Sequence, residues 1–140
     1  MSRQVSNVDR AKLGKRNKRL GSDAERYYAK KFREISPNFE HCKTSRQGSK
    51  LFDDSKIDLI FIPYNAQIKA GEQRGLKPRD ELMSMQAEME KNFPKTSAEF
   101  TFPKLLIHKM PAKSAKRTEY DELVTMTFSD FTKIISQIHT

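Results

Sequence analysis

The sequence has few residues that could cross-link the chain or anchor it in a membrane. Among its 140 residues there is one cysteine, Cys42, which excludes an internal disulfide and a cysteine-based metal cluster. A single thiol is typical of a reducing, cytoplasmic compartment. The longest apolar run, IDLIFIP, is interrupted by an aspartate and is far shorter than the roughly 20 residues that span a bilayer. No apolar stretch follows the basic first residues, so we expect neither a secretory signal nor a membrane element.

Charge of one sign is in excess. The chain carries 27 Lys+Arg against 18 Asp+Glu, a formal net charge of +9 and a pI near 9.7. A basic chain without a membrane element most often binds a polyanion, and nucleic acid is the commonest one inside cells. Ordinary solubility charge is the alternative, but the cations are clustered in two segments. These are Lys12, Lys15, Arg16, Lys18 and Arg19 near the start, and Lys109, Lys113, Lys116 and Arg117 near the end.

The pattern along the chain predicts one domain preceded by a basic segment. Residues 1–20 are polar, basic and aperiodic, which predicts a flexible N-terminal arm or a frayed helical turn, with order beginning at Gly21 and a single domain over 21–140. From Ser22 onward apolar residues recur at helical spacing, and Pro37 should end that helix. Its predicted buried face consists of Ala24, Tyr28, Phe32 and Ile35.

The remaining elements alternate between strands and helices. Strands are predicted at 39–44, 57–62, 66–70, 104–108 and 122–126, with a turn-rich loop at 45–56. A helix from Pro78 should bury Leu82, Met85, Met89 and Phe93. A closing helix from Phe128, capped by Thr127, should bury a stripe made of Phe131, Ile134, Ile135 and Ile138. This order predicts an α/β sandwich with a mixed sheet and helices on both faces.

Polar residues interrupt the two strands that we expect to pair as a hairpin across residues 63–65. Asp58 lies in the strand predicted at 57–62. Gln67 and Lys69 share one face of the strand predicted at 66–70, because strand side chains alternate. A four-residue loop would set Asp58 opposite Lys69, whereas a shift of one residue would separate them. An acid, an amide oxygen and a lysine suit metal-assisted phosphodiester hydrolysis, because Mg²⁺ prefers oxygen ligands and activates water. By spacing alone, a buried Lys–Asp pair that stabilises a hairpin explains these residues equally well.

Residues 17–71 resemble the PD-(D/E)XK nuclease superfamily, most closely the small phage and archaeal Holliday junction resolvases. The match rests on GSDAERYYAKKF with Glu25, TSRQGSKLFDDSKID with Asp58, and AQIKAG with Gln67 and Lys69. It implies a restriction-endonuclease-like three-layer sandwich in which a central mixed sheet is flanked by helices, with a core of helix, three strands, helix, strand. It also implies a Mg²⁺- or Mn²⁺-dependent endonuclease that cuts branched DNA as a homodimer, in the host cytoplasm if the chain is phage-encoded.

The resemblance also assigns roles to individual residues. Glu25 and Asp58 would serve the metal, with Gln67 as a further ligand, and Lys69 would act in catalysis. Gln67 departs from the pattern, since this position is usually acidic, but the Mrr-like restriction enzymes are similar in carrying QxK. Metal affinity would then depend more on Asp58 and Glu25. A restriction-like nuclease acting on duplex DNA and a non-cleaving DNA-binding module are the alternatives.

Several residues around this motif have competing interpretations. Glu25 follows Ser22 at capping-box spacing, so it could instead cap a helix that begins there. The loop residues Ser45, Arg46, Ser49 and Lys50 are predicted to contact phosphates, and a solvated loop is the alternative. Asp53 and Asp54 are typical turn residues, with a supporting role near the metal favoured for Asp54. Lys15, Arg16, Lys18 and Arg19, together with the loop 109–117, are predicted to bind the DNA backbone.

Overall fold

The computed structural model describes residues 7–139 and has an α/β fold, as predicted. The helices are α1 (Asn7–Ile35), α2 (Ser45–Gly48), α3 (Lys50–Asp54), α4 (Pro78–Asn92) and α5 (Phe128–Ile138). The strands are β1 (Lys43–Thr44), β2 (Leu59–Ile60), β3 (Asn65–Ala70), β4 (Lys104–Lys109) and β5 (Glu122–Thr125). The segment 45–56, predicted as a loop, instead forms α2 and α3. In the part of the chain that is described, no helix is both long and apolar enough to cross a membrane.

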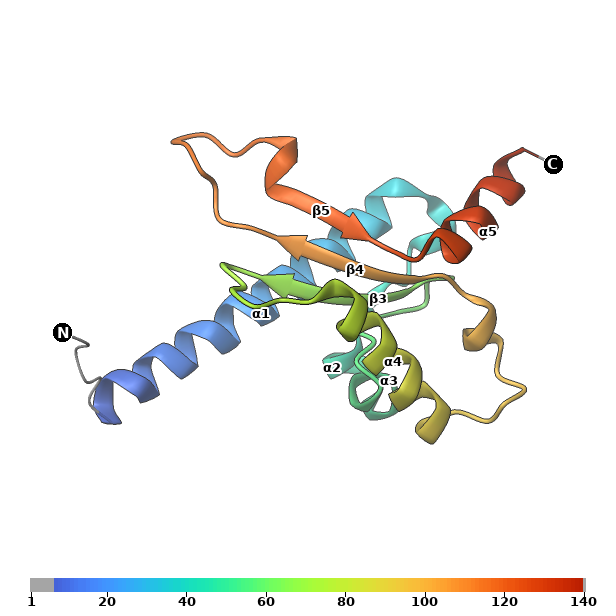
Figure 1. Ribbon diagram of the computed structural model, residues 1–140, viewed down its shortest axis with the longest axis horizontal. Helices are drawn as coiled ribbons and strands as arrows, with labels where there is room; N and C mark the ends of the chain where they lie inside the picture. The colour runs from blue at the N-terminus through green and yellow to red at the C-terminus, as the bar shows by residue number, and fades with distance from the viewer. Residues whose placement is uncertain (1–6, 140) are drawn as a thin grey trace.

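The strands form two small sheets. In one, β1 pairs antiparallel with β2. In the other, β3 runs parallel to β4, and β4 pairs antiparallel with β5 (Figure 1). The predicted hairpin between 57–62 and 66–70 is therefore wrong. After Ile60 the backbone leaves the extended conformation at Phe61, whose φ of 66° is left-handed, and Pro63 has no amide to donate to a ladder. The partners that replace the hairpin come from distant parts of the chain.

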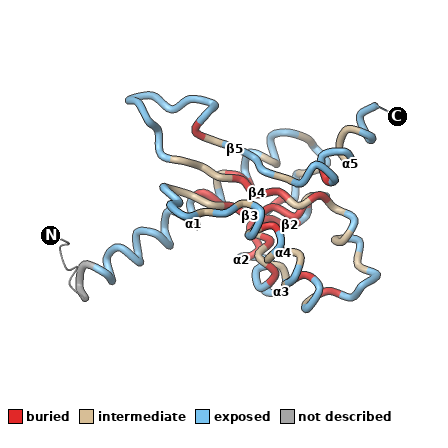
Figure 2. Tube along the Cα trace, in the orientation of Figure 1, coloured by how far each residue is buried: buried red, intermediate tan, exposed pale blue. Residues whose placement is uncertain are grey.

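Helix α1 begins at Asn7, well before the predicted start at Ser22. Its first half contains no proline and many Lys, Arg and Leu residues, which favour helix. Figure 1 shows this half extending away from the sheets, and Figure 2 shows it exposed. The predicted arm is thus helical over residues 7–20, while residues 1–6 lie outside the described part. Ala24 and Tyr28 are buried as predicted, but Ile35 is 69% exposed.

The core is divided into two apolar clusters, and β3 packs against α1 in the first of them. On one side, α1 packs Ala24 and Tyr28 against Ala66 and Ile68 of β3 and Ile107 of β4. The second cluster is formed by Ile57, Met85, Met89 and Phe93, so the predicted face of α4 is confirmed. Leu105, Leu106 and Ile107 of β4 are consecutive and all buried, which is typical of a strand covered on both faces. The side chains of β3 that point away from α1 are polar, and they belong to the site described below.

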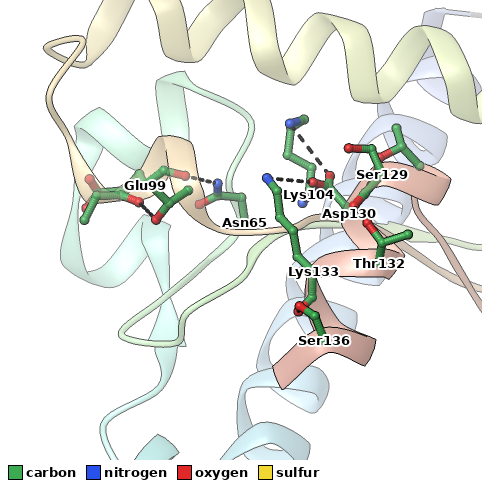
Figure 3. Close-up of polar contacts among 11 residues, drawn as sticks. Asn65, Glu99, Lys104, Ser129, Asp130, Thr132, Lys133 and Ser136 are labelled. Atoms are coloured by element: carbon green, nitrogen blue, oxygen red, sulfur yellow. Dashed lines mark hydrogen bonds and ion pairs between the residues drawn. The ribbon is translucent and has the colours of Figure 1, made fainter. Parts of the chain in front are cut away.

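The C-terminal helix is held by polar contacts rather than by its apolar stripe. Thr127 caps it as predicted, accepting a hydrogen bond from the Asp130 amide at 3.0 Å. Phe131 and Ile138, expected in the core, are 43% and 70% exposed. Asp130 is buried instead, with Lys104 of β4 and Lys133 pointing towards it (Figure 3). The other two residues of the predicted stripe, Ile134 and Ile135, are half-buried.

Candidate active site

Asp58 is fixed to the middle of β3 by its backbone and its carboxylate. Its amide donates to the Ala66 carbonyl at 2.7 Å, and its own carbonyl accepts from the Ser45 amide at 2.8 Å. Its Oδ2 accepts from the Ile68 amide at 2.7 Å. The predicted position opposite Lys69 is therefore wrong. The carboxylate instead contacts the backbone of Ile68, the residue between Gln67 and Lys69 in β3.

The charge of Asp58 is poorly compensated. The pKa of this carboxyl is raised to about 7, mainly by burial and in addition by the neighbouring Glu25 and Asp53 carboxylates, while the Ile68 hydrogen bond and Arg46 act in the opposite direction. The sequence favoured turn roles for Asp53 and Asp54 and placed a supporting role, as the lesser alternative, at Asp54 rather than Asp53. In the structure it is the charge of Asp53 that acts on Asp58 and Glu25. A cluster of acids in a partly buried position is an environment that a cation would stabilise.

Glu25 lies on α1 and is 4% exposed. Arg46 binds both carboxylate oxygens of Glu25, with its Nε 2.9 Å from Oε2 and its Nη2 3.2 Å from Oε1. Burial raises the pKa of Glu25, and Arg46 counteracts that effect. The capping-box interpretation is wrong, because α1 runs straight through Ser22 and the hydroxyl there accepts from Arg46 at 3.3 Å. Glu25 thus belongs to the site and not to a helix start.

Gln67 and Lys69 meet a residue that the sequence analysis missed. Glu81 of α4 accepts from the Gln67 Nε2 at 3.3 Å, and the same carboxylate oxygen lies 3.7 Å from the Lys69 Nζ. An acid in the first turn of a helix is ordinarily explained by the helix dipole, so its position gave no signal. Gln67 Oε1 and Ser45 Oγ are buried and have no hydrogen-bond partner among the described residues. Buried polar atoms in that state call for a water, an ion or a functional role.

A cavity of about 410 Å³ opens at the end of β3. Glu25 and Arg46 line it from one side, and Ile68 and Lys69 line it from the strand. Asp58 is tied to this wall through its hydrogen bond to the Ile68 amide. The fold therefore brings α1, the α2 segment and β3 to one place.

The predicted phosphate-contacting residues divide into two pairs. Ser45 is buried and Arg46 lines the cavity, so both lie at the site. Ser49 caps α3, accepting from the Phe52 amide at 3.4 Å, and Lys50 is exposed. A role in phosphate binding remains a prediction for all four residues.

The two basic segments meet beside the cavity. Lys15, Arg16, Lys18 and Arg19 are all exposed on the first half of α1. Arg16 lines a neighbouring cavity of about 280 Å³ together with Lys109 and Arg117, from the far end of the chain. Leu20 and Gly71 line both cavities. Cations from both clusters thus lie next to the acids, an arrangement that suits a phosphate backbone.

The oxygen atoms at the site are of the type that binds a hard cation, with water completing the coordination. Residues 7–139 contain no group of three or more Asp, Glu, His or Cys side chains placed to bind a metal. The oxygens on offer are the carboxylates of Asp58 and Glu25 and the unpartnered Oε1 of Gln67. Mg²⁺ is commonly bound through one or two carboxylates and keeps several waters, so this set is sufficient for it. Comparisons with protein-family models, curated proteins and solved structures find no match.

Proposed function

We propose that this chain is a metal-dependent endodeoxyribonuclease that hydrolyses phosphodiester bonds in branched DNA, as a Holliday junction resolvase does. The observation that carries the proposal is the Asp58 carboxylate. It is anchored to β3 between Gln67 and Lys69, it lies near Glu25, and it lacks a compensating cation of its own. A structural acid is normally paired with a cation or with several donors.

Each residue of the site has a role in this proposal. Asp58, Glu25 and Gln67 would hold Mg²⁺ or Mn²⁺. The ion would supply an activated water and neutralise charge on the phosphate. Lys69, on the cavity wall, would orient the attacking water and stabilise the negative charge that develops on the phosphate. Arg46 would exchange Glu25 for a substrate phosphate, because a guanidinium binds either partner through two hydrogen bonds.

The arrangement of elements supports a restriction-endonuclease-like sandwich as part of this proposal. Helix α1 packs on one side of β3 and α4 contacts its other side. The elements α1, β1, β2, β3, α4 and β4 follow the order helix, three strands, helix, strand when the short helices α2 and α3, which lie between β1 and β2, are set aside. The mixed β3–β4–β5 sheet would be its centre, with β1 and β2 extending it.

The preference for branched DNA is inferred from the basic surface. Arg16 of α1 and Lys109 and Arg117 from the other basic segment line the cavity next to the site. Such contacts position a phosphate backbone without reading sequence. We therefore propose recognition by DNA shape, and a homodimer, because a C2 pair supplies one site for each of the two symmetric strands to be cut.

One observation favours a second function, a non-cleaving DNA-binding module. Arg46 occupies both oxygens of Glu25, and Glu81 partly neutralises Lys69. If these contacts persisted with DNA bound, the site would have one free carboxylate. The basic surface would then bind DNA without cutting it.

The deciding experiment compares a four-way junction with linear duplex DNA, in Mg²⁺ or in a chelator. Metal-dependent cutting of the junction, abolished in Lys69→Ala, supports the resolvase. The matched control is Lys95→Ala, which removes an exposed lysine beyond α4. Cutting of linear duplex would indicate a restriction-like enzyme. Binding without cutting by the unmodified chain would indicate the non-cleaving module.

A further inference from the structure

Glu81 makes two contacts with the motif strand through one oxygen atom. Its Oε2 lies 3.3 Å from the Gln67 amide nitrogen and 3.7 Å from the Lys69 ammonium. Both partners come from the same face of β3, two residues apart, whereas Glu81 lies in the first turn of α4. The Lys69 and Glu81 side chains are 27% and 26% exposed, so solvent screens their ion pair only in part.

The first contact determines which way the Gln67 amide faces. An ionised carboxylate only accepts hydrogen bonds, so the atom of Gln67 that faces Glu81 must be the nitrogen. The oxygen is then turned away from α4. That oxygen is buried and has no partner among residues 7–139. Rotating the amide would give Oε1 a carboxylate as its neighbour, so Glu81 disfavours the rotated state.

We propose that Glu81 is a positioning residue of the site, which presents the Gln67 oxygen to the metal and limits where the Lys69 ammonium can lie. This inference rests on the proposed function. It implies that the glutamine of the QxK motif, unlike a carboxylate, must be held in one orientation. A carboxylate at position 67 would offer two equivalent oxygens and need no orientation. An amide has one oxygen and one nitrogen, and a neighbour must select between them.

The test measures Mn²⁺ binding to the full chain by calorimetry, together with the metal dependence of junction cleavage. Glu81→Gln keeps the shape of the side chain but removes the charge and offers a hydrogen-bond donor, so the amide at 67 can rotate. We expect Mn²⁺ affinity to fall about 10- to 100-fold, the usual effect of losing a residue that orients a metal ligand. The matched control is Asp80→Asn, which removes the same charge from the neighbouring, exposed position of α4 and should leave affinity unchanged.

A swapped pair separates positioning from simple helix packing. In Gln67→Glu/Glu81→Gln the total charge is that of the natural chain, and an amide can still donate to a carboxylate across the same gap. We expect this double variant to recover Mn²⁺ affinity to within about threefold of the natural chain, because the oxygen at 67 no longer needs orienting. A packing role predicts that thermal stability, and not Mn²⁺ affinity, follows these changes.

The outcomes distinguish this inference from the proposed function. If the natural chain cuts a junction with metal and Glu81→Gln binds Mn²⁺ equally well, the positioning role is wrong and the nuclease stands. If the swapped pair binds no better than Glu81→Gln, the positioning role is also wrong. If the natural chain neither binds Mn²⁺ nor cuts DNA, both are overturned. If Glu81→Gln lowers Mn²⁺ affinity and the swapped pair restores it, the positioning role and the proposed function are both supported.

Discussion

Two aspartates, Asp130 buried and Asp58 half-buried, show how differently this fold treats negative charge. Asp130 in α5 accepts from the Lys104 amide at 3.0 Å and lies 3.2 and 3.8 Å from the ammonium groups of Lys133 and Lys104 (Figure 3). Burial alone would raise its pKa, but these donors outweigh burial and lower the pKa below its usual value. Asp58 has one backbone donor and two acidic neighbours, and its pKa is raised to about 7.

Under the proposed function, the difference separates a structural acid, Asp130, from a functional one, Asp58. Asp130 is paired within the chain and joins α5 to β4, so it needs nothing further. Asp58 is held as firmly by its backbone, yet the chain leaves its charge uncompensated. Groups held in an unfavourable ionisation state in this way cluster at functional sites. The comparison predicts opposite responses to the same substitution.

The largest expected difference is in catalysis. Asp58→Asn should lower metal-dependent junction cleavage by roughly 10²- to 10³-fold or more, since a group that stabilises the reacting charge is lost. Asp130→Asn should leave the rate per folded molecule unchanged, because it lies outside the cavity. Single-turnover cleavage of a labelled junction measures both. Equal losses of cleavage rate in Asp58→Asn and Asp130→Asn would contradict the division into a functional and a structural aspartate.

The next difference is in stability at alkaline pH without metal. The folded-state pKa of Asp58 is above its unfolded value of about 3.9, so the folded state holds the proton more tightly. Stability is therefore lost as pH rises from about 4 to about 7. Asp58→Asn should increase stability near pH 8 by up to about 4 kcal/mol and by almost nothing near pH 4. Denaturant unfolding of the variant and of the natural chain at both pH values measures this. A variant that is no more stable than the natural chain at pH 8 would contradict the prediction.

Asp130 should behave in the opposite way. Its folded-state pKa is lowered, so its contribution is present above the unfolded pKa of about 3.9 and is lost as pH falls through the folded value. Asp130→Asn should destabilise the chain at neutral pH by about 2 kcal/mol, the scale of a hydrogen bond to a charged group. The same unfolding series measures it. A variant that gains stability at neutral pH would contradict the ion pairs seen here.

The smallest expected effect is on the pKa of Asp58 itself. Glu25→Gln removes a neighbouring negative charge and releases Arg46, and both changes favour ionised Asp58. The pKa of Asp58 should move down towards its usual range, while that of Asp130 should not change. Carboxyl-carbon NMR across the titration resolves the two residues. An unchanged Asp58 midpoint would mean that Glu25 is not coupled to it.

The sequence predicted those parts of the fold that local patterns determine. The buried face of α4, strands β4 and β5, and the Thr127 cap are confirmed because helical spacing, apolar runs and caps act over a few residues. The hairpin failed because β1 and β4 lie far along the chain and compete for β2 and β3. The helical start of α1 was missed because a basic, polar helix has no apolar period to detect.

The candidate site was predictable in its residues but not in its contacts. Asp58, Gln67 and Lys69 stood out as polar side chains in apolar strands. In the structure Asp58 contacts the backbone of β3 at Ile68, while Gln67 and Lys69 contact Glu81. Glu81 and Asp130 gave no signal, since each is an ordinary acid in a first helical turn until distant residues meet it. Long-range pairing decides which acid is compensated, and a linear pattern does not contain that information.

The most direct test of the account is the Asp58 titration repeated with Mg²⁺. A cation bound at this carboxylate competes with the proton and lowers the apparent pKa. The account predicts an Asp58 midpoint near 7 without metal, a midpoint well below 7 in saturating Mg²⁺, and an Asp130 midpoint unchanged by metal. An Asp58 midpoint that does not respond to Mg²⁺ would contradict a metal site at this carboxylate.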